Sequence, residues 1–202
     1  MLRFGLTGGI ASGKSTVSAM LRELGFAVLE ADLVAHQLIE PGLPAYEEIL
    51  QEFDGAIVGS GKEIDRAALA KIVFADPVKL QRLNAIVHPR VEKRIVSALA
   101  DLERNGSPTA AFVEAALIFE AGLDKKLDGV VVVWCKLEQQ IERLVSRGFT
   151  EEEARRRIAA QLPVEEKLHR ATVKIDCSGS IAETRRQIQD FATKLGAARP
   201  TA

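Results

Sequence analysis

The sequence predicts an α/β protein built on a parallel sheet, with a helical insertion and a lid segment that bears arginines. Three observations predict this fold class. A glycine-rich loop stands between a short apolar run and an amphipathic helix near the amino end. Several helical patterns then follow one another without an intervening strand. Later in the chain, residues 129–134 are nearly all β-branched, which is typical of a central parallel strand buried on both faces.

The glycine-rich loop is the strongest functional signal. Residues 8–15 fit the pattern G-x-x-x-x-G-K-[ST], with Gly8, Gly13, Lys14 and Ser15 at the fixed positions. Such a loop turns its backbone N–H groups inward toward phosphate oxygens, and the following helix adds the positive end of its dipole. Lys14 is expected to reach the β- and γ-phosphates, and Ser15 to ligate Mg²⁺. The sequence therefore predicts a nucleoside triphosphate site in a three-layer P-loop NTPase core.

The composition limits the class of protein to which the chain can belong. The 202 residues suit a single domain over 1–202, and a hydrophobic content of 47% with 27% charged residues is ordinary for a soluble globular chain. With 27 basic and 28 acidic residues, the charge balance favours neither nucleic acid nor a membrane as a partner. The first predicted strand begins at once, so no targeting segment is expected. The two cysteines lack CxxC spacing and suit a reducing cytoplasm.

A second predicted strand, at 26–29, leads directly into Asp32. Acidic residues at the carboxyl end of such a strand lie where open α/β sheets bind ligands. Asp is equally suited to cap a short helix that starts at Leu33. From the residues alone, both interpretations of Asp32 stay open.

Residues 41–105 read as a helical insertion, which is a natural place to hold a second substrate. Asp65 and Asp76 are each placed to begin a helix, and His88-Pro89 is expected to break the second of these helices. Without further information, His88 is better interpreted as a buried structural histidine.

The remaining pattern predicts strands at 109–115, 129–134 and 173–175, and a lid over about 146–170. Thr150 opens a capping box at the start of the lid helix. On that helix, Arg155, Arg156 and Arg157 are interpreted as a solvated face with Glu151–Arg155 and Glu153–Arg157 pairs. Arg143 and Arg147 flank the glycine break at Gly148 and are expected to contact phosphates instead.

A phosphate loop serves several classes of protein. The Asn-Lys-x-Asp segment that reads guanine is absent, which argues against a GTPase. A motor ATPase would need a strand that ends in a magnesium-ordering aspartate, whereas the best candidate strand ends Val133-Trp134-Cys135. A carboxylate after the second strand, a helical insertion and arginines near a lid favour a small-molecule kinase.

Several segments together resemble the dephospho-CoA kinase family. They are Leu6-Thr7-Gly8-Gly9-Ile10-Ala11-Ser12-Gly13-Lys14-Ser15-Thr16, Glu30-Ala31-Asp32, residues 83–89 ending in His88-Pro89, Leu117-Ile118-Phe119-Glu120, residues 140–143 with Arg147, and residues 157–161. The resemblance runs from the first strand to about Ser180. The His-Pro segment and its spacing from Asp32 are the specific part, because the phosphate loop is shared widely.

The resemblance implies ATP-dependent phosphorylation of the ribose 3′-hydroxyl of dephospho-CoA, the last step of coenzyme A biosynthesis, with ATP and Mg²⁺ as cofactors. It implies Asp32 as the general base, with Lys14 and Arg147 stabilising the transferring phosphoryl group. ATP would be bound by Gly9, Ile10, Ala11, Ser12, Gly13, Lys14, Ser15, Thr16, Arg143 and Arg147, and the acceptor by Thr7, Asp32, His88, Pro89 and Glu120. The insertion would bind the coenzyme. A cytoplasmic monomer or weak homo-oligomer is expected.

The chain departs from the family pattern at four positions. Glu30 and Ala116 stand where Asp and Pro are usual, and Thr172 and Cys177 stand where Asp and Asn are typical near the adenine. No adenine contact is therefore assigned to the last two. The alternatives to this function are another small-molecule or nucleoside monophosphate kinase and a nucleotide-sensing protein that does not turn over.

Overall fold

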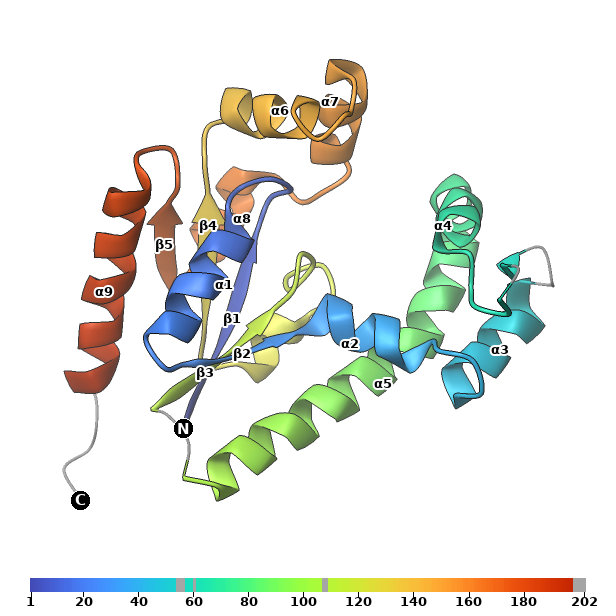
Figure 1. Cartoon of the computed structure of the whole chain (residues 1–202), viewed down its shortest axis with the longest axis horizontal. Coiled ribbons are helices and arrows are strands. Elements are labelled where there is room, and N and C mark those ends of the chain that lie inside the picture. Colours follow the sequence, from blue (N-terminus) through green and yellow to red (C-terminus); the bar gives the residue numbers. More distant parts are fainter. Residues whose placement is uncertain (54–56, 60, 107–108, 198–202) are drawn as a thin grey trace. The chain divides into compact units, whose positions relative to one another are not determined.

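The computed structural model describes residues 1–53, 57–59, 61–106 and 109–197. Its centre is a five-stranded parallel sheet in the order β2-β3-β1-β4-β5. The strands are β1 (Leu2–Gly8), β2 (Ala27–Glu30), β3 (Ala110–Glu114), β4 (Gly129–Trp134) and β5 (Val173–Asp176). Each coincides with a predicted strand to within two residues at either end. Because all five run in one direction, their carboxyl ends meet at one edge of the sheet (Figure 1).

The β-branched run forms β4, which is buried at five of its six positions and pairs with β1 on one side and β5 on the other. On the other side of β1 lies β3, and β2 forms the edge. In this register Leu6 of β1 lies beside both Val131 and Glu114. The glycine-rich loop, which follows β1, therefore leaves the sheet from its central strand.

Helices cover both faces of the sheet, which confirms the three-layer α/β fold. On one face, α1 (Lys14–Glu23) and α9 (Ile181–Ala197) pack together over β1 and β5, and α8 (Val164–Arg170) packs against β4 on the other (Figure 1). The core beneath α1 and α9 holds a cluster of three phenylalanines, Phe4, Phe112 and Phe191, whose ring centroids lie 5.5–6.1 Å apart. Burial of such rings is a large share of the apolar area that stabilises this unit.

The helices α6 (Leu137–Val145) and α7 (Glu151–Ala159) pack against each other. The predicted capping box is confirmed, since Thr150 N–H donates to Glu153 (2.8 Å) and Glu153 N–H donates to the Thr150 hydroxyl (3.2 Å). The Glu151–Arg155 pair is also present at 2.7 Å. The expected Glu153–Arg157 pair is wrong. Glu153 is committed to the cap, and the Arg157 guanidinium lies 4.3 Å from the centroid of the Phe149 ring.

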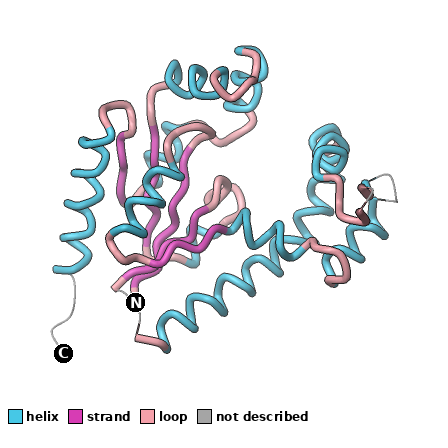
Figure 2. Tube along the Cα trace, in the orientation of Figure 1, coloured by secondary structure: helices cyan, strands magenta, loops and turns pink. Residues whose placement is uncertain are grey.

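Residues 31–100 form a second compact unit, in which the long elements are helices (Figure 2). They are α2 (Ala31–Leu38), α3 (Pro44–Phe53), α4 (Arg66–Ala75) and α5 (Pro77–Arg104), the last of which continues beyond the unit. The unit has its own apolar core, made chiefly by Tyr46, Ile49 and Phe53 of α3 with Leu69 and Val73 of α4. A separate core is what an independently packed insertion requires.

The two predicted helix starts, at Asp65 and Asp76, are confirmed, and of the two interpretations left open for Asp32 the structure does not support the cap. Asp65 caps α4 by accepting from the N–H groups of Ala67 (2.9 Å) and Ala68 (3.0 Å), and Asp76 accepts from Val78 N–H (2.9 Å) where α5 begins. Asp32, by contrast, does not cap a helix that starts at Leu33. Helix α2 begins at Ala31, so Asp32 lies inside its first turn.

The predicted break at His88-Pro89 is also wrong, because α5 runs through Pro89 without interruption. Proline removes one N–H from the helical ladder and usually ends or kinks a helix. Here the Arg90 guanidinium donates to the Ile86 carbonyl at 2.6 Å, in the turn that the proline disturbs. Val91 and further apolar residues on one face are buried beyond this point, so packing favours continuation of the helix.

The structure also contains the short 3-10 helix η2 (Leu123–Lys126) and an isolated antiparallel bridge between Val58 and Ile64. Among the described residues, no helix combines the length and the apolar character that crossing a bilayer requires.

Candidate active site

The glycine-rich loop joins the end of β1 to the start of α1, as the motif predicts. Gly13 has φ 110°, a value that an L side chain rarely adopts, and Ala11 is also left-handed at φ 58°. Alternation of such residues with right-handed ones produces a concave row of N–H groups, and no side chain caps the amino end of α1. The loop is therefore a ready cradle for an anion.

A cavity of about 480 Å³ opens over this cradle, a size that suits a small-molecule ligand. It is lined by Ile10, Ala11, Ser12, Gly13, Lys14, Ser15, Thr16, Ala116, Arg143, Arg147, Gln161, Cys177, Gly179, Ile181 and Thr184. Nine of the ten residues that the sequence assigns to ATP are in this lining, and Gly9 is the exception. All of the lining belongs to the unit that holds the sheet.

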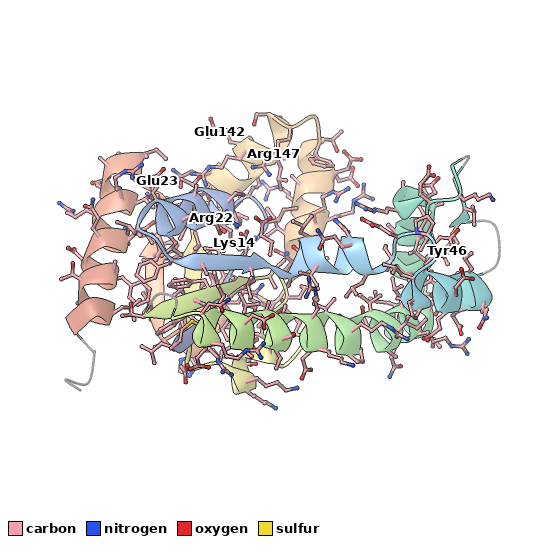
Figure 3. All side chains as sticks on the ribbon, turned by 60° about the horizontal axis from the view of Figure 1, so that its bottom comes forward. Lys14, Arg22, Glu23, Tyr46, Glu142 and Arg147 are labelled. Carbon is pink, nitrogen blue, oxygen red and sulfur yellow. The ribbon has the colours of Figure 1, made fainter. Side chains whose placement is uncertain are left out.

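The two arginines that were expected to contact phosphates, Arg143 and Arg147, have different surroundings. Arg143 of α6 donates to the Ala11 carbonyl at 3.0 Å and the Cys177 carbonyl at 3.1 Å, and its Nη1 lies 3.4 Å from the Cys135 sulfur. Its guanidinium thus ties the glycine-rich loop to the segments that follow β4 and β5. Arg147 is exposed one turn later and forms no ion pair with any residue that the structure describes (Figure 3). Its charge is available to a ligand.

Ser15 is suited to hold Mg²⁺ beside a bound triphosphate. It is exposed in the first turn of α1. Mg²⁺ characteristically takes one or two protein ligands together with phosphate oxygens and water. Ser12 is buried in the same loop and its hydroxyl has no partner among the described residues, so a polar ligand there would satisfy it. A carboxylate that sequence analysis missed, Glu114, ends the neighbouring strand β3 and accepts from Ser18 of α1 at 2.5 Å.

Two of the residues predicted to bind the acceptor, Thr7 and Glu120, belong to a connected network instead of the cavity lining. Thr7 is fully buried, and its hydroxyl donates to the Ala116 carbonyl at 3.1 Å. The same carbonyl accepts from the Lys167 ammonium at 3.2 Å. Lys167 is fully buried and lies 3.1 Å from Glu120, whose side chain is 25% exposed and also accepts from Leu162 N–H at 3.2 Å. The Ala116 carbonyl is thus held from two sides.

Lys167 was not found by sequence reasoning. It lies in a stretch rich in charged residues, Val164–Arg170, where a lysine is ordinarily solvated. Nothing in the local pattern signals that its ammonium points inward, because the partner, Glu120, is distant in sequence and the contact depends on how α8 packs on the sheet.

The other predicted acceptor residues, Asp32, His88 and Pro89, lie in the helical unit. Asp32 is exposed in the first turn of α2, two residues after β2 ends. His88 is exposed on α5 next to Pro89, which contradicts the interpretation of a buried structural histidine. Partial desolvation of the ring lowers the pKa of His88, so the neutral imidazole is favoured near neutral pH.

The wall formed by the segment between β5 and α9 is the part of the cavity that the sequence left unassigned. Cys177, Gly179, Ile181 and Thr184 line it. A Cβ added to Gly13 would meet the Cys177 sulfur at 3.2 Å, so this segment packs closely on the glycine-rich loop. Burial raises the pKa of Cys177, which makes it a packed thiol and not a nucleophile. The sequence did offer one signal for this wall: the segment follows a predicted parallel strand, and ligands bind at the carboxyl ends of such strands.

Comparison with known proteins agrees with this geometry. The family model described as dephospho-CoA kinase matches residues 2–183. A relative from Geobacillus kaustophilus named dephospho-CoA kinase is 48% identical over 188 residues, which cover 93% of each chain. A solved protein from Thermus thermophilus is 38% identical with a TM-score of 0.84 and coverage of 96% of this chain and 97% of its own. The solved dephospho-CoA kinase of Campylobacter jejuni is 29% identical with a TM-score of 0.72 and the same two coverages. A family model that matches residues 2–183, together with relatives matched over nine-tenths of the chain, shows that this chain belongs to the dephospho-CoA kinase family.

Proposed function

We propose that this chain transfers the γ-phosphoryl group of ATP to the 3′-hydroxyl of the ribose in dephospho-CoA, which yields coenzyme A and ADP. One observation carries the proposal: a chain of this family places its phosphate loop, Lys14 and Arg147 around one cavity at the carboxyl edge of the sheet. Phosphoryl transfer needs mainly positioning and charge neutralisation, and this arrangement supplies both.

The nucleotide occupies the cavity with its phosphates over the glycine-rich loop. The loop N–H groups and Lys14 bind phosphate oxygens, and Arg147 neutralises charge that develops on the transferring group. We place the nucleoside along the wall made by Cys177 and Ile181, which line the same cavity as the glycine-rich loop. Ser15 would hold Mg²⁺, which would offset the charge of the phosphates.

The acceptor is activated by Asp32. Its carboxylate takes the proton of the ribose 3′-hydroxyl while that oxygen forms a bond to the γ-phosphorus. The bond from the γ-phosphorus to the β,γ-bridging oxygen breaks, and ADP leaves. Asp32 is supported in this role by its place two residues after a parallel strand, where α/β sheets bind ligands. His88, Pro89 and Glu120 bind the acceptor, and the insertion at about 41–105 is its coenzyme-binding part, with a lid over about 146–170.

We further propose that the enzyme acts in the cytoplasm as a monomer or weak homo-oligomer. Cys135 and Cys177 are both buried and unpaired, and unpaired buried thiols suit a reducing compartment.

ADP release measured against a panel of acceptors tests this function. Dephospho-CoA should stimulate release, whereas AMP, CMP, shikimate and pantothenate should not. Stimulation by AMP and not by dephospho-CoA would assign the chain to nucleoside monophosphate kinases. ATP binding without stimulation by any acceptor would favour a nucleotide sensor.

The variant Asp32→Asn tests the base. It should bind ATP as wild type does while its turnover falls by ~10²-fold or more, the usual scale for general-base catalysis. His36→Asn, which changes another exposed residue of α2, is the matched control and should keep its turnover. Equal losses of ATP binding and turnover in Asp32→Asn would instead make Asp32 a structural residue.

A further inference from the structure

Gln161 makes a contact inside the phosphate cradle that the reaction does not require. Its Oε1 accepts a hydrogen bond from the backbone N–H of Ile10 at 2.8 Å, and both residues line the cavity. Gln161 lies just beyond α7, and its own N–H donates to the Ile158 carbonyl at 3.2 Å. The lid segment therefore reaches into the glycine-rich loop through one side chain.

The N–H that Gln161 occupies belongs to a residue of the phosphate motif that lines the cavity. Ile10 is the third residue of the phosphate motif, between Gly9 and Ala11. The N–H of Ser12, by contrast, is used within the loop by the Gly9 carbonyl at 3.2 Å. An inward-facing backbone N–H at a cavity wall needs an acceptor. In this structure the carboxamide oxygen of Gln161 is that acceptor.

We propose that Gln161 is an exchangeable ligand of the cradle: it holds Ile10 N–H until a triphosphate oxygen replaces it, and its carboxamide then turns to donate through Nε2 to the phosphate. Glutamine suits this exchange because one carboxamide carries an acceptor for the N–H and a donor for the anion. The inference rests on the proposed nucleotide site but not on the identity of the acceptor.

The exchange links phosphate occupancy to the lid. Leu162, the next residue, is anchored through its N–H to Glu120 at 3.2 Å, and Glu120 is held by the buried Lys167. The chain is thus fixed immediately after Gln161, so release of Ile10 is confined to the Gln161 side chain and the end of α7. Gln161 is therefore a positioning residue whose hydrogen bonds depend on whether a triphosphate occupies the cradle.

The amide resonance of Ile10 tests the exchange directly. In ¹⁵N-labelled protein without nucleotide, Gln161→Ala should shift the Ile10 resonance, because the N–H loses its acceptor. With Mg²⁺ and a non-hydrolysable ATP analogue, or with inorganic tripolyphosphate, wild type and Gln161→Ala should converge, because phosphate is then the partner in both. Resonances that coincide without nucleotide, or that stay apart with it, would overturn the proposal.

A second variant tests the same idea through affinity. Gln161→Glu keeps the acceptor for Ile10 N–H but places a negative charge against the phosphate, so the Kd for the ATP analogue should rise at least ~10-fold. Gln189→Glu makes the same change at an exposed position of α9 and should leave this Kd within twofold. An unchanged Kd in Gln161→Glu refutes the exchange while leaving the proposed function intact. Failure of wild type to bind any triphosphate refutes both.

Discussion

The buried ion pair between Lys167 and Glu120 predicts an asymmetric response to mutation. The Lys167 side chain is 0% exposed, whereas that of Glu120 is 25% exposed. In Glu120→Gln the amide oxygen can still accept from Leu162 N–H, so the main loss is the charge that balances the ammonium. Lys167 then keeps only neutral acceptors, the Ala116 carbonyl and the amide oxygen, and an ammonium buried without a counter-ion is strongly destabilising.

The stability that Glu120→Gln loses has an upper bound. A lysine can escape burial of its charge by losing its proton, and for an ordinary lysine at pH 7 this costs about 4.6 kcal/mol. We expect Glu120→Gln to lower the free energy of unfolding by about 3 kcal/mol, within the range for removal of one partner of a buried pair. Lys167→Met retains the volume and leaves Glu120 partly solvated, so about 1 kcal/mol is expected.

Thermal and chemical unfolding of both single variants and the double variant test this argument. At about 2–4 °C per kcal/mol for a chain of this size, Glu120→Gln should melt about 6–12 °C below wild type. The double variant should be more stable than Glu120→Gln alone. Glu151→Gln, which breaks the exposed pair with Arg155, is the control and should stay within about 0.5 kcal/mol of wild type. Equal losses in the two single variants, or additive losses in the double variant, would refute the reasoning.

Two further predictions concern the glycine-rich loop and the thiols. Gly8→Ala would place a Cβ 2.1 Å from the Val133 carbonyl oxygen. Because this is a backbone atom that cannot turn away, folding should be lost or the melting temperature should fall steeply. As the control, a Cβ at Gly196 meets nothing within 4 Å, so Gly196→Ala should be tolerated or slightly stabilising. Burial raises the pKa of Cys135 and Cys177, so fewer thiolates form at pH 8. Mass spectrometry should therefore find neither residue alkylated by iodoacetamide until the protein unfolds. Rapid labelling of the native protein would contradict their burial.

The features that the sequence predicted correctly depend on residues that lie close to one another along the chain. The five strands and the phosphate loop follow from short apolar runs and from glycine spacing, and the capping box at Thr150 follows from residues three positions apart. The α5 break was wrong because the Arg90 side chain and a continuous buried face support the helix through Pro89, and neither effect is part of proline's intrinsic propensity.

What the sequence could not predict depends on contacts between distant segments. Lys167 reads as a surface residue until α8 packs on the sheet and meets Glu120. The wall that contains Cys177 reaches the glycine-rich loop only because β5 lies beside β4 and its following segment turns toward Gly13. The cavity is therefore predictable where it is made by one motif and unpredictable where another part of the chain closes it.

The two side chains that hold the glycine-rich loop differ in what can replace them. Arg143 donates to the Ala11 carbonyl, and a phosphate, which offers only acceptors when fully ionised, cannot take the place of a donor. Gln161 accepts from the Ile10 N–H, and a phosphate oxygen can take the place of an acceptor. Of these two contacts, a triphosphate leaves the first in place and can displace the second. The first preserves the shape of the cradle when it fills, and the second allows Gln161 to respond to the filling.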